Sequence, residues 1–516
     1  MKIFKYISIA IIFMMLATVS SCKKKDKVAT SDKFAIDSLQ LDSFFKNHPD
    51  FAKYKEDVTE LYNKHNYRFV WYDDDGRVDF ADILYNRASQ IEKEGVPAPL
   101  PYKEKIDDIF SNDRKKPNLE KELLISSMYF FYAQKVYDGL DPKKSRELGW
   151  YLPREKMSYV DYLDKLMDDK DLIKEDEEAM PELYYNLRKS LHHYREIRSK
   201  GGWGTITLPE GVKSLKPGDN MPAVAQLRKR LAIAGYLSSD NKSTLYDDGL
   251  VNALKDWQTK HGIQADGLAG PSVISSLNKS VEERIKTILV NMERCRWLSD
   301  AIDDDEEFIF VNIPQFKMRY VKDGKTRLES NVVVGKELNK TVIFSGKMSY
   351  LVFSPYWNVP KSITEKEILP ALEADPNYLE SHNMEWHEER IRQRPGPNNS
   401  LGLVKFMFPN RNNIYLHDTP AKSLFKRDDR ALSHGCVRVE KARDLAVAIL
   451  EDDKNWSAKK IDEAMHAGEE KHYALKRKIP VYLTYFTAIA DDKGVVRFFD
   501  DVYNRDERLA HMLYTD

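Results

Sequence analysis

Cysteine is scarce in this sequence. Its 516 residues include only three, at positions 22, 295 and 436, and so few cannot staple a disulfide-rich scaffold. Each cysteine must therefore be explained by its own surroundings. Cys295 lies between two arginines in a segment predicted to be helical, with no histidine near it in the sequence. We expect it to be a packed core side chain and not a reactive thiol.

An excess of charge of one sign is also missing. The chain has 81 Lys and Arg against 82 Asp and Glu, for a formal net charge of −1, so no overall basic field attracts nucleic acid. No segment combines clustered basic residues with stacking aromatic residues. The sequence therefore predicts no nucleic-acid partner.

Long apolar runs are absent after the first 22 residues. At the start, Lys2 and Lys5 precede an apolar run from Ile7 to Leu16, which is shorter than the roughly 20 residues of a membrane-spanning helix. This pattern predicts a signal peptide over 1–21, followed by a polar tether over 22–40. Val19-Ser20-Ser21-Cys22 resembles a bacterial lipobox, which implies cleavage before Cys22 and its lipidation. An ordinary signal peptide with a chance cysteine remains the alternative.

The composition is that of a soluble globular protein, with 42% hydrophobic and 32% charged residues. The length predicts about three domains. Residues 41–200 are rich in Leu, Tyr, Lys and Glu at helical spacing, and Leu123 to Val136 carries an apolar face. We predict a helical domain without chemistry of its own, in which Trp71 belongs to the core.

A compact unit over 212–279 follows a Gly-rich linker. Leu227, Leu231 and Gly235 indicate one helix and its end, and Trp257-Gln258 lies on a second helix before His261-Gly262. These residues resemble the peptidoglycan-binding module found beside many cell-wall enzymes, which implies a three-helix fold that holds the protein on the wall. A spacer that binds nothing is the alternative, and we expect His261 to be structural.

The last third is predicted to be mostly β. After a helix from Val281 to about Leu298, β-rich runs flank hairpin signals at Asp323-Gly324 and Asp491–Gly494. A helical stretch from Thr364 to about Arg394 interrupts them. We predict a β domain over 300–490 with an inserted lid at about 361–400, and a C-terminal hairpin and tail over 491–516.

Two segments of this region carry the candidate chemistry, Tyr415-Leu416-His417-Asp418 and Ser433-His434-Gly435-Cys436-Val437-Arg438. A thiol is mostly protonated at neutral pH, and an imidazole within reach takes its proton and returns it to a leaving amine. Gly435 allows a turn whose N–H groups face a carbonyl, and Arg438 is suited to a substrate carboxylate.

Two other interpretations fit these residues. The cysteine can be a buried side chain packed beside two histidines. His417, His434 and Cys436 are also zinc-ligand types, but they lack a fourth ligand at finger-like spacing. We therefore predict no metal and no cofactor.

The pattern of His417 followed by Ser433-His434-Gly435-Cys436 and Arg438 resembles the L,D-transpeptidase signature. The surrounding segments resemble its large, YcbB-like branch: 353–360, 394–399, 401–402, 404–406 and 415–420. The resemblance implies a multidomain α+β protein: a helical scaffold domain, a small three-helix peptidoglycan-binding module, and a mostly β catalytic domain with an inserted helical lid.

The resemblance also implies roles. Cys436 attacks a donor tetrapeptide stem of peptidoglycan, expels its terminal D-alanine, and passes the thioester to an acceptor stem amine to make a 3–3 cross-link; carbapenems would acylate the same thiol. His417 is the base and acid, and a backbone carbonyl orients its ring. Oxyanion binding or shaping of the site is assigned to Gly435, His434, Tyr415 and Ser433, and substrate binding to Trp357, Arg438 and Asp418.

Other outcomes of the same thioester remain open. Water as acceptor gives an L,D-carboxypeptidase, and a protein amine attaches an envelope protein to the wall. A non-catalytic wall-binding lipoprotein is the alternative of another class. In each case we expect the periplasmic side of the cell envelope, with Cys22 anchored by lipid to a membrane, which we take to be the outer membrane.

Overall fold

The computed structural model describes residues 35–112, 114–154, 157–168, 180–261, 263–298 and 305–515. The predicted signal peptide, Cys22 and most of the tether lie outside these ranges. The end of the tether does not: helix α1 begins at Ser38. Within the described ranges, no helix has the length and apolar character needed to cross a membrane.

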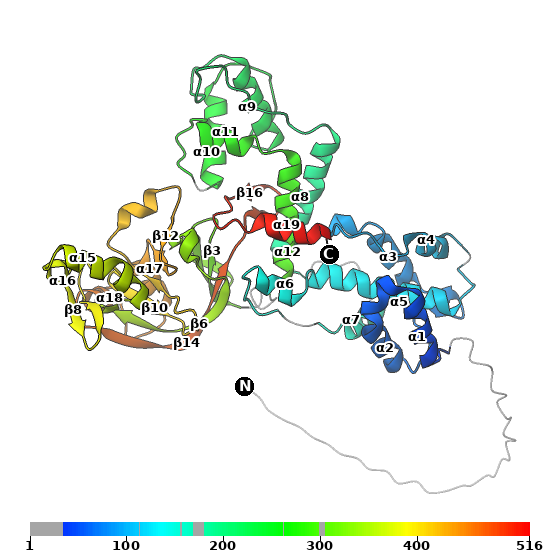
Figure 1. Ribbon diagram of the computed structural model, residues 1–516. Coiled ribbons are helices and arrows are strands. Elements are labelled where there is room, and N and C mark those ends of the chain that lie inside the picture. The colour runs from blue at the N-terminus through cyan, green and yellow to red at the C-terminus, as the bar shows by residue number, and fades with distance from the viewer. Residues whose placement is uncertain are drawn as a thin grey trace, which may run out of the picture.

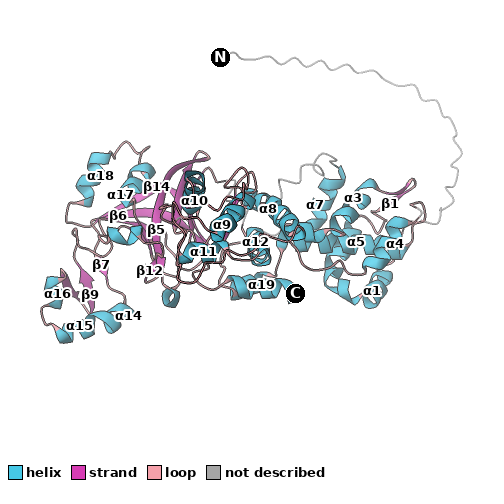
Figure 2. Ribbon diagram, turned by 90° about the horizontal axis from the view of Figure 1, so that it is seen from above, coloured by secondary structure: helices cyan, strands magenta, loops and turns pink. Residues whose placement is uncertain are grey.

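The N-terminal helices form a unit with its own core, at one end of the molecule (Figures 1 and 2). Its central helix, α5, is buried nearly all round, which explains its almost uninterrupted apolar sequence. Trp71 is fully buried and its indole N–H donates to Ser126 Oγ, so it belongs to the core as predicted. The helices of this unit are α1 (Ser38–Asn47), α2 (Lys55–Lys64), α3 (Asp79–Ala88), α4 (Lys103–Ser111), α5 (Leu119–Ala133) and α7 (Tyr159–Asp168). The short helix α6 (Pro142–Glu147) lies between Leu140 and Trp150, which belong to the core of the β domain.

Helix α8 (Glu182–Ser199) lies within the predicted helical range of 41–200 but contributes to a different core. It packs along α12 (Val281–Arg296), and both helices share the large core of the β domain. A capping box starts α12, in which Ser280 and Glu283 satisfy each other's backbone N–H groups. These two helices connect the N-terminal unit with the β domain (Figure 1).

Three helices with a separate apolar core form the module between α8 and α12. They are α9 (Pro222–Ile233), α10 (Asp248–Lys260) and α11 (Pro271–Leu277). Asp247 caps α10 by accepting the Leu250 N–H, and Gly235 follows α9 with φ +80°. The three-helix fold predicted for this unit is confirmed.

The β domain is built on a nine-stranded sheet with the order β12-β5-β13-β11-β10-β6-β14-β3-β4. Strand β5 also pairs with β4, so eight of the strands close into a ring and β12 adds to its edge. Helices α17 (Ala442–Ile449) and α18 (Ala458–Met465) belong to the same domain. The strands are β3 (Glu307–Asn312), β4 (Lys317–Lys322), β5 (Lys325–Gly335), β6 (Phe344–Phe353), β10 (Val404–Met407), β11 (Leu416–His417), β12 (Ala431–Ser433), β13 (Val437–Val439) and β14 (Lys471–Thr484).

An insertion between β7 (Trp357–Asn358) and β10 projects from the sheet (Figure 2). Its first half is helical, as predicted, but the helix expected to continue to Arg394 is wrong for the second half. There, β8 (Met384–His387) and β9 (Arg390–Gln393) form a hairpin that pairs with β7. Alternation explains the difference, since Met384 and Ile391 point into a small local core while their neighbours are more exposed. The helical pieces are α14 (Lys361–Ile363), a π-helical turn (Thr364–Ile368), α15 (Leu369–Ala374) and α16 (Tyr378–Ser381).

The C-terminal hairpin forms at the predicted turn and with the expected second strand, but its first strand is a different segment. Ala488–Ala490 (β15) pairs with Val496–Phe498 (β16), whereas the segment expected as its first strand belongs to β14 of the main sheet. The last residues are not a tail. They form α19 (Asp506–Thr515), which buries Leu509 and Leu513 and packs against α12.

Candidate active site

Three neighbouring strands place the candidate residues on one face of the sheet. In β10, β11 and β13, Lys405 lies in register with His417, and His417 with Arg438, so their side chains share a face. The alternate residues Leu416 and Val437 point into the buried core instead.

Tyr415 and Cys436 lie two residues before His417 and Arg438, and the period of two along a strand gives them the same face. All five side chains line one cavity of about 1090 Å³, together with Trp357, His434 and residues of the insertion. The structure thus brings together most of the residues predicted for the site.

His417 is held as a neutral base. The ring is 4% exposed, and Nδ1 lies 2.5 Å from the backbone carbonyl of Asp418. A carbonyl only accepts, so Nδ1 carries the proton and Nε2 keeps its lone pair. Burial, followed by the nearby Arg438 charge, lowers the pKa of His417 to about 3. The imidazole is therefore uncharged at neutral pH.

Cys436 is half-buried and protonated at neutral pH. Burial raises the pKa of its thiol, while hydrogen bonds from Tyr415 and the charges of Lys405 and Arg438 act in the opposite direction. The resting pair is consequently a neutral thiol and a neutral imidazole, in which the nucleophile has to be deprotonated during attack.

The thiol does not yet donate to His417. Its S–H points to the backbone carbonyl of Asn413, with Sγ 3.7 Å from that oxygen. Across the described residues, no hydrogen bond joins Cys436 to His417. Both groups line the same cavity, and catalytic hydrogen bonds commonly tighten only when substrate is bound.

The turn before Cys436 is fixed by Ser433 and Gly435. Ser433 Oγ donates to the Cys436 carbonyl at 2.6 Å and accepts the Gly435 N–H at 3.1 Å. Gly435 has φ +120°, which a side chain would strain, and its carbonyl accepts from Thr341. The Gly435 amide is therefore occupied and not available to an oxyanion, contrary to expectation. In the described parts of the chain, the Cys436 N–H has no protein acceptor.

His434 and Trp357 connect the site to the insertion. His434 Nε2 lies 2.8 Å from Glu367 Oε1 in the π-helical turn. Trp357 stands in β7, opposite Gln393 of the insertion's hairpin, and lines the cavity. The insertion therefore forms one wall of the site.

Two cations face the cavity. Arg438 Nε is buried with no hydrogen-bond partner, and Lys405 Nζ lies 4.2 Å above the Tyr415 ring. Burial lowers the pKa of both side chains. This arrangement suits a carboxylate on the substrate. Lys405 was not predicted as a site residue, because only its strand register with His417, which the structure gives, brings it to this face.

Asp418 does not line the cavity. Its carboxylate lies 2.6 Å from Lys422 Nζ and accepts the Leu403 N–H at 2.9 Å. The carboxylate is therefore turned away from the cavity, although we predicted it to bind substrate there. Its backbone carbonyl orients the imidazole of His417, as expected of a backbone group there.

Cys295 is fully buried in the core of the β domain. Over the described residues, no group of three or more His, Cys, Asp or Glu side chains is arranged to hold a metal ion.

Comparison with known proteins gives three family matches. Residues 306–456 match the L,D-transpeptidase catalytic domain, residues 56–191 the Scaffold domain, and residues 220–277 the "Putative peptidoglycan binding domain". A Haemophilus influenzae protein named "Putative L,D-transpeptidase" is 35% identical over 243 residues, which are 43% of this chain and 48% of that protein. The chain thus spans about half the length of this curated relative.

Solved structures of L,D-transpeptidases are also similar, at low TM-scores. One from Stackebrandtia nassauensis is 16% identical and covers 52% of this chain and 94% of its own, with a TM-score of 0.22. Another, from Xylanimonas cellulosilytica, is 14% identical and covers 54% and 100%, with a TM-score of 0.18.

Residues 306–456 therefore form an L,D-transpeptidase catalytic domain, which the chain combines with a scaffold domain and a peptidoglycan-binding domain, as in the YcbB-like branch of this family.

Proposed function

We propose that the protein is an L,D-transpeptidase that forms 3–3 cross-links between peptidoglycan stems through a thioester on Cys436. The observation that carries this proposal is the neutral His417, whose Nδ1–H is fixed on the Asp418 carbonyl and which lines the same cavity as Cys436.

In the first step, the Cys436 S–H gives its proton to His417 Nε2 while sulfur bonds to the carbonyl carbon of the third stem residue. The resulting oxyanion is stabilised by the Cys436 N–H, and one such donor is typically worth about 3 kcal/mol. The C–N bond to D-alanine then breaks, and His417 returns the proton to the departing amine. An amine of a second stem attacks the thioester and restores the thiol.

Arg438 and Lys405 are proposed to bind carboxylates of the donor stem, and Trp357 to line its groove beneath the insertion. The same nucleophile would be acylated by carbapenems. Lipidation of Cys22 and attachment to a membrane, with the outer membrane as our choice, complete the proposal from the sequence.

Incubation of the purified protein with sacculi, followed by mass spectrometry of the muropeptides, tests the reaction. We expect new 3–3 dimers and released D-alanine, and neither product from Cys436→Ala. Tripeptides without dimers would assign water as the acceptor, and protein-linked stems would assign a protein amine. Dimers formed equally by Cys436→Ala would remove this thiol from the mechanism.

A further inference from the structure

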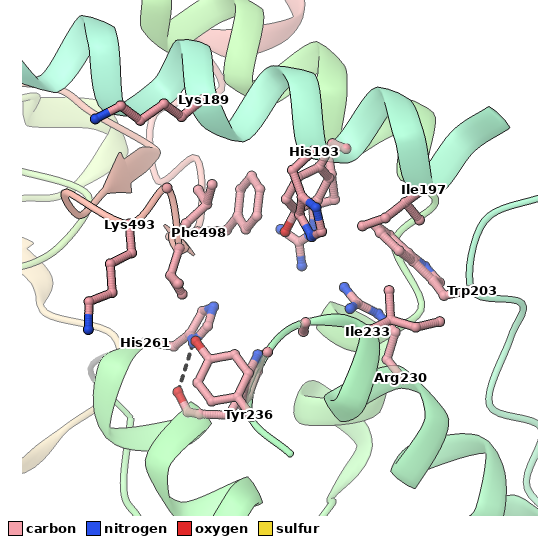
Figure 3. A pocket seen from close by; sticks show the side chains of 18 residues that line it. Lys189, His193, Ile197, Trp203, Arg230, Ile233, Tyr236, His261, Lys493 and Phe498 are labelled. Atoms are coloured by element: carbon pink, nitrogen blue, oxygen red, sulfur yellow. Dashed lines mark hydrogen bonds between the residues drawn. The ribbon is translucent and has the colours of Figure 1, made fainter. Parts of the chain in front are cut away.

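A second cavity lies at the junction of the three-helix module with the rest of the chain, and we propose that it binds a carboxylate group of peptidoglycan. It measures about 250 Å³. Figure 3 shows its walls: Lys189 and His193 from α8, Arg230, Tyr236 and His261 from the module, and Lys493 and Phe498 from the C-terminal hairpin.

The charge of this cavity has one sign. Lys189, Arg230, Arg284 and Lys493 line it, and none of its described lining residues is Asp or Glu. The negative charges of Glu283 and Asp500 raise the pKa of Arg284, but neither residue lines the cavity. His261 adds no charge, because burial lowers its pKa to about 3. A bound anion would balance the cations that surround the space.

Three buried polar atoms at this junction have no partner. They are Arg230 Nη1, Arg284 Nε and the Tyr236 hydroxyl. Both arginines are only 5% exposed. Buried donors are nearly always satisfied in proteins, so three orphans around one space indicate a missing acceptor. A carboxylate bound in this space would supply acceptors to those of the three groups that it reaches.

The two arginines are already positioned for such a ligand. Arg230 Nε donates to the Leu277 carbonyl at 3.0 Å, and the guanidinium stacks 3.8 Å above the Trp203 ring. Arg284 is held in the same way, by the Ser276 carbonyl at 2.5 Å and by the Phe498 ring at 4.2 Å. Because each side chain is fixed at one edge, little conformational entropy is lost when the other edge binds.

The other residues that line the cavity indicate what kind of group carries the bound carboxylate. Trp257 and His261 stack on each other, and Ile197 and Ile233 add apolar surface. A carboxylate carried by a sugar ring or by a short peptide fits these walls, since both present an apolar face beside the charge. The lactyl carboxylate of muramic acid and the carboxylates of the stem peptide share this chemistry. The choice of peptidoglycan rests on the proposed function, whereas the preference for an anion does not.

Occupancy of this cavity would have a structural consequence. Its walls come from the module, α8, α12 and the C-terminal hairpin, so one ligand contacts elements far apart in the sequence. Binding of wall material is then coupled to how firmly the module docks beside the catalytic domain.

Ligand-observed NMR titrations of the full chain carrying Cys436→Ala, which prevents turnover, test the proposal. The probes are N-acetylmuramic acid, N-acetylglucosamine as the matched sugar without the lactyl carboxylate, and the dipeptide L-alanyl-γ-D-glutamate. We expect a carboxylate probe to bind and N-acetylglucosamine not to bind. Arg230→Lys and Tyr236→Phe should each weaken binding, the former about tenfold because an orphan donor to a charged acceptor is lost.

Lys229→Gln is the matched control, because Lys229 is exposed on the same helix and does not line the cavity. Tyr236→Phe and Lys493→Gln keep the test valid if Arg230→Lys fails to fold. Binding of the sugar acid or of the dipeptide with this dependence supports the site and identifies the source of the carboxylate. No binding by either, or equal loss with Lys229→Gln, would overturn the proposal, whatever the muropeptide analysis gives.

Discussion

At the scale of single residues, burial determines the protonation states of His417 and Cys436 in the active site. His417 and Cys436 share the cavity with Lys405 and Arg438, and together the desolvation and the positive charges keep the imidazole neutral. The thiol is neutral for a related reason, since burial outweighs the hydrogen bonds and charges that favour the thiolate. The reaction therefore requires a general base, not a preformed thiolate–imidazolium pair.

Because the thiol and the imidazole are both neutral at rest, we predict how the rate of Cys436 alkylation depends on pH. The measurement is reaction with iodoacetamide at a series of pH values, followed by peptide mapping of Cys436. The pKa of the thiol is raised above its ordinary value, so the thiolate fraction should grow about tenfold per pH unit between about pH 6 and 9, without a plateau. The pKa of His417, about 3, adds no inflection in this range. A plateau near neutral pH would show a preformed ion pair and contradict our description.

The resemblance of the motif to the L,D-transpeptidase signature predicted that His417 and Cys436 share one site and that Gly435 lies in a turn, and the structure has this arrangement. Their catalytic roles stay predictions. Lys405 and the carbonyl of Asn413 could not be found in this way, since their proximity depends on strand register and on a loop. The role of Asp418 was misjudged for a similar reason: the backbone faces the site and the carboxylate faces Lys422.

At the scale of elements, the insertion between β7 and β10 forms one wall of the cavity that holds the Cys436 thiol. One contact joins it directly to the catalytic turn, the pair of His434 Nε2 and Glu367 Oε1 at 2.8 Å. Both side chains are partly exposed, and a contact of this kind contributes at most the roughly 0.2–1 kcal/mol of an exposed ion pair. The contact is therefore strong enough to bias the position of the insertion but weak enough to open for substrate.

Glu367→Gln should open the insertion more often. We expect up to about a fivefold faster reaction of Cys436 with a bulky maleimide, which follows from the energy of an exposed ion pair, and little change with iodoacetamide. Glu365→Gln is the matched control, because Glu365 pairs with Lys361 inside the insertion and does not bridge to the turn. Equal acceleration in both variants, or in neither, would remove this contact as the latch.

The hairpin in the insertion shows a limit of sequence patterns at this scale. Residues 384–393 follow helical segments and carry many charged side chains, so alternation was obscured. This segment forms strands because it pairs with β7 and because Ile391 packs into the small core of the insertion.

At the scale of the whole molecule, the described residues form three large apolar cores and a small one in the insertion. The module has a core of its own, whereas α8, α12 and α19 belong to the core of the catalytic domain. The sequence predicted the existence and order of these units, because each carries its own periodic pattern. It did not show that α8 leaves the N-terminal helices, since amphipathic helices do not specify which apolar surface they cover.

Deletion of residues 212–279, replaced by a short Gly/Ser linker, should reduce pelleting of the protein with sacculi, because the deletion removes the module and one wall of the junction cavity. Release of D-alanine from a soluble tetrapeptide is the control for the integrity of the catalytic domain. Unchanged pelleting with retained D-alanine release would leave the module as a spacer.

Intact-protein mass spectrometry after mixing with a stem tetrapeptide, without acceptor, tests the central claim most directly. We predict a single acyl-enzyme that carries the tripeptide on Cys436, with D-alanine released in equal amount, and no such species in His417→Gln or Cys436→Ala. D-alanine release without a thioester at Cys436, or an adduct that His417→Gln forms at the same rate, would contradict this account.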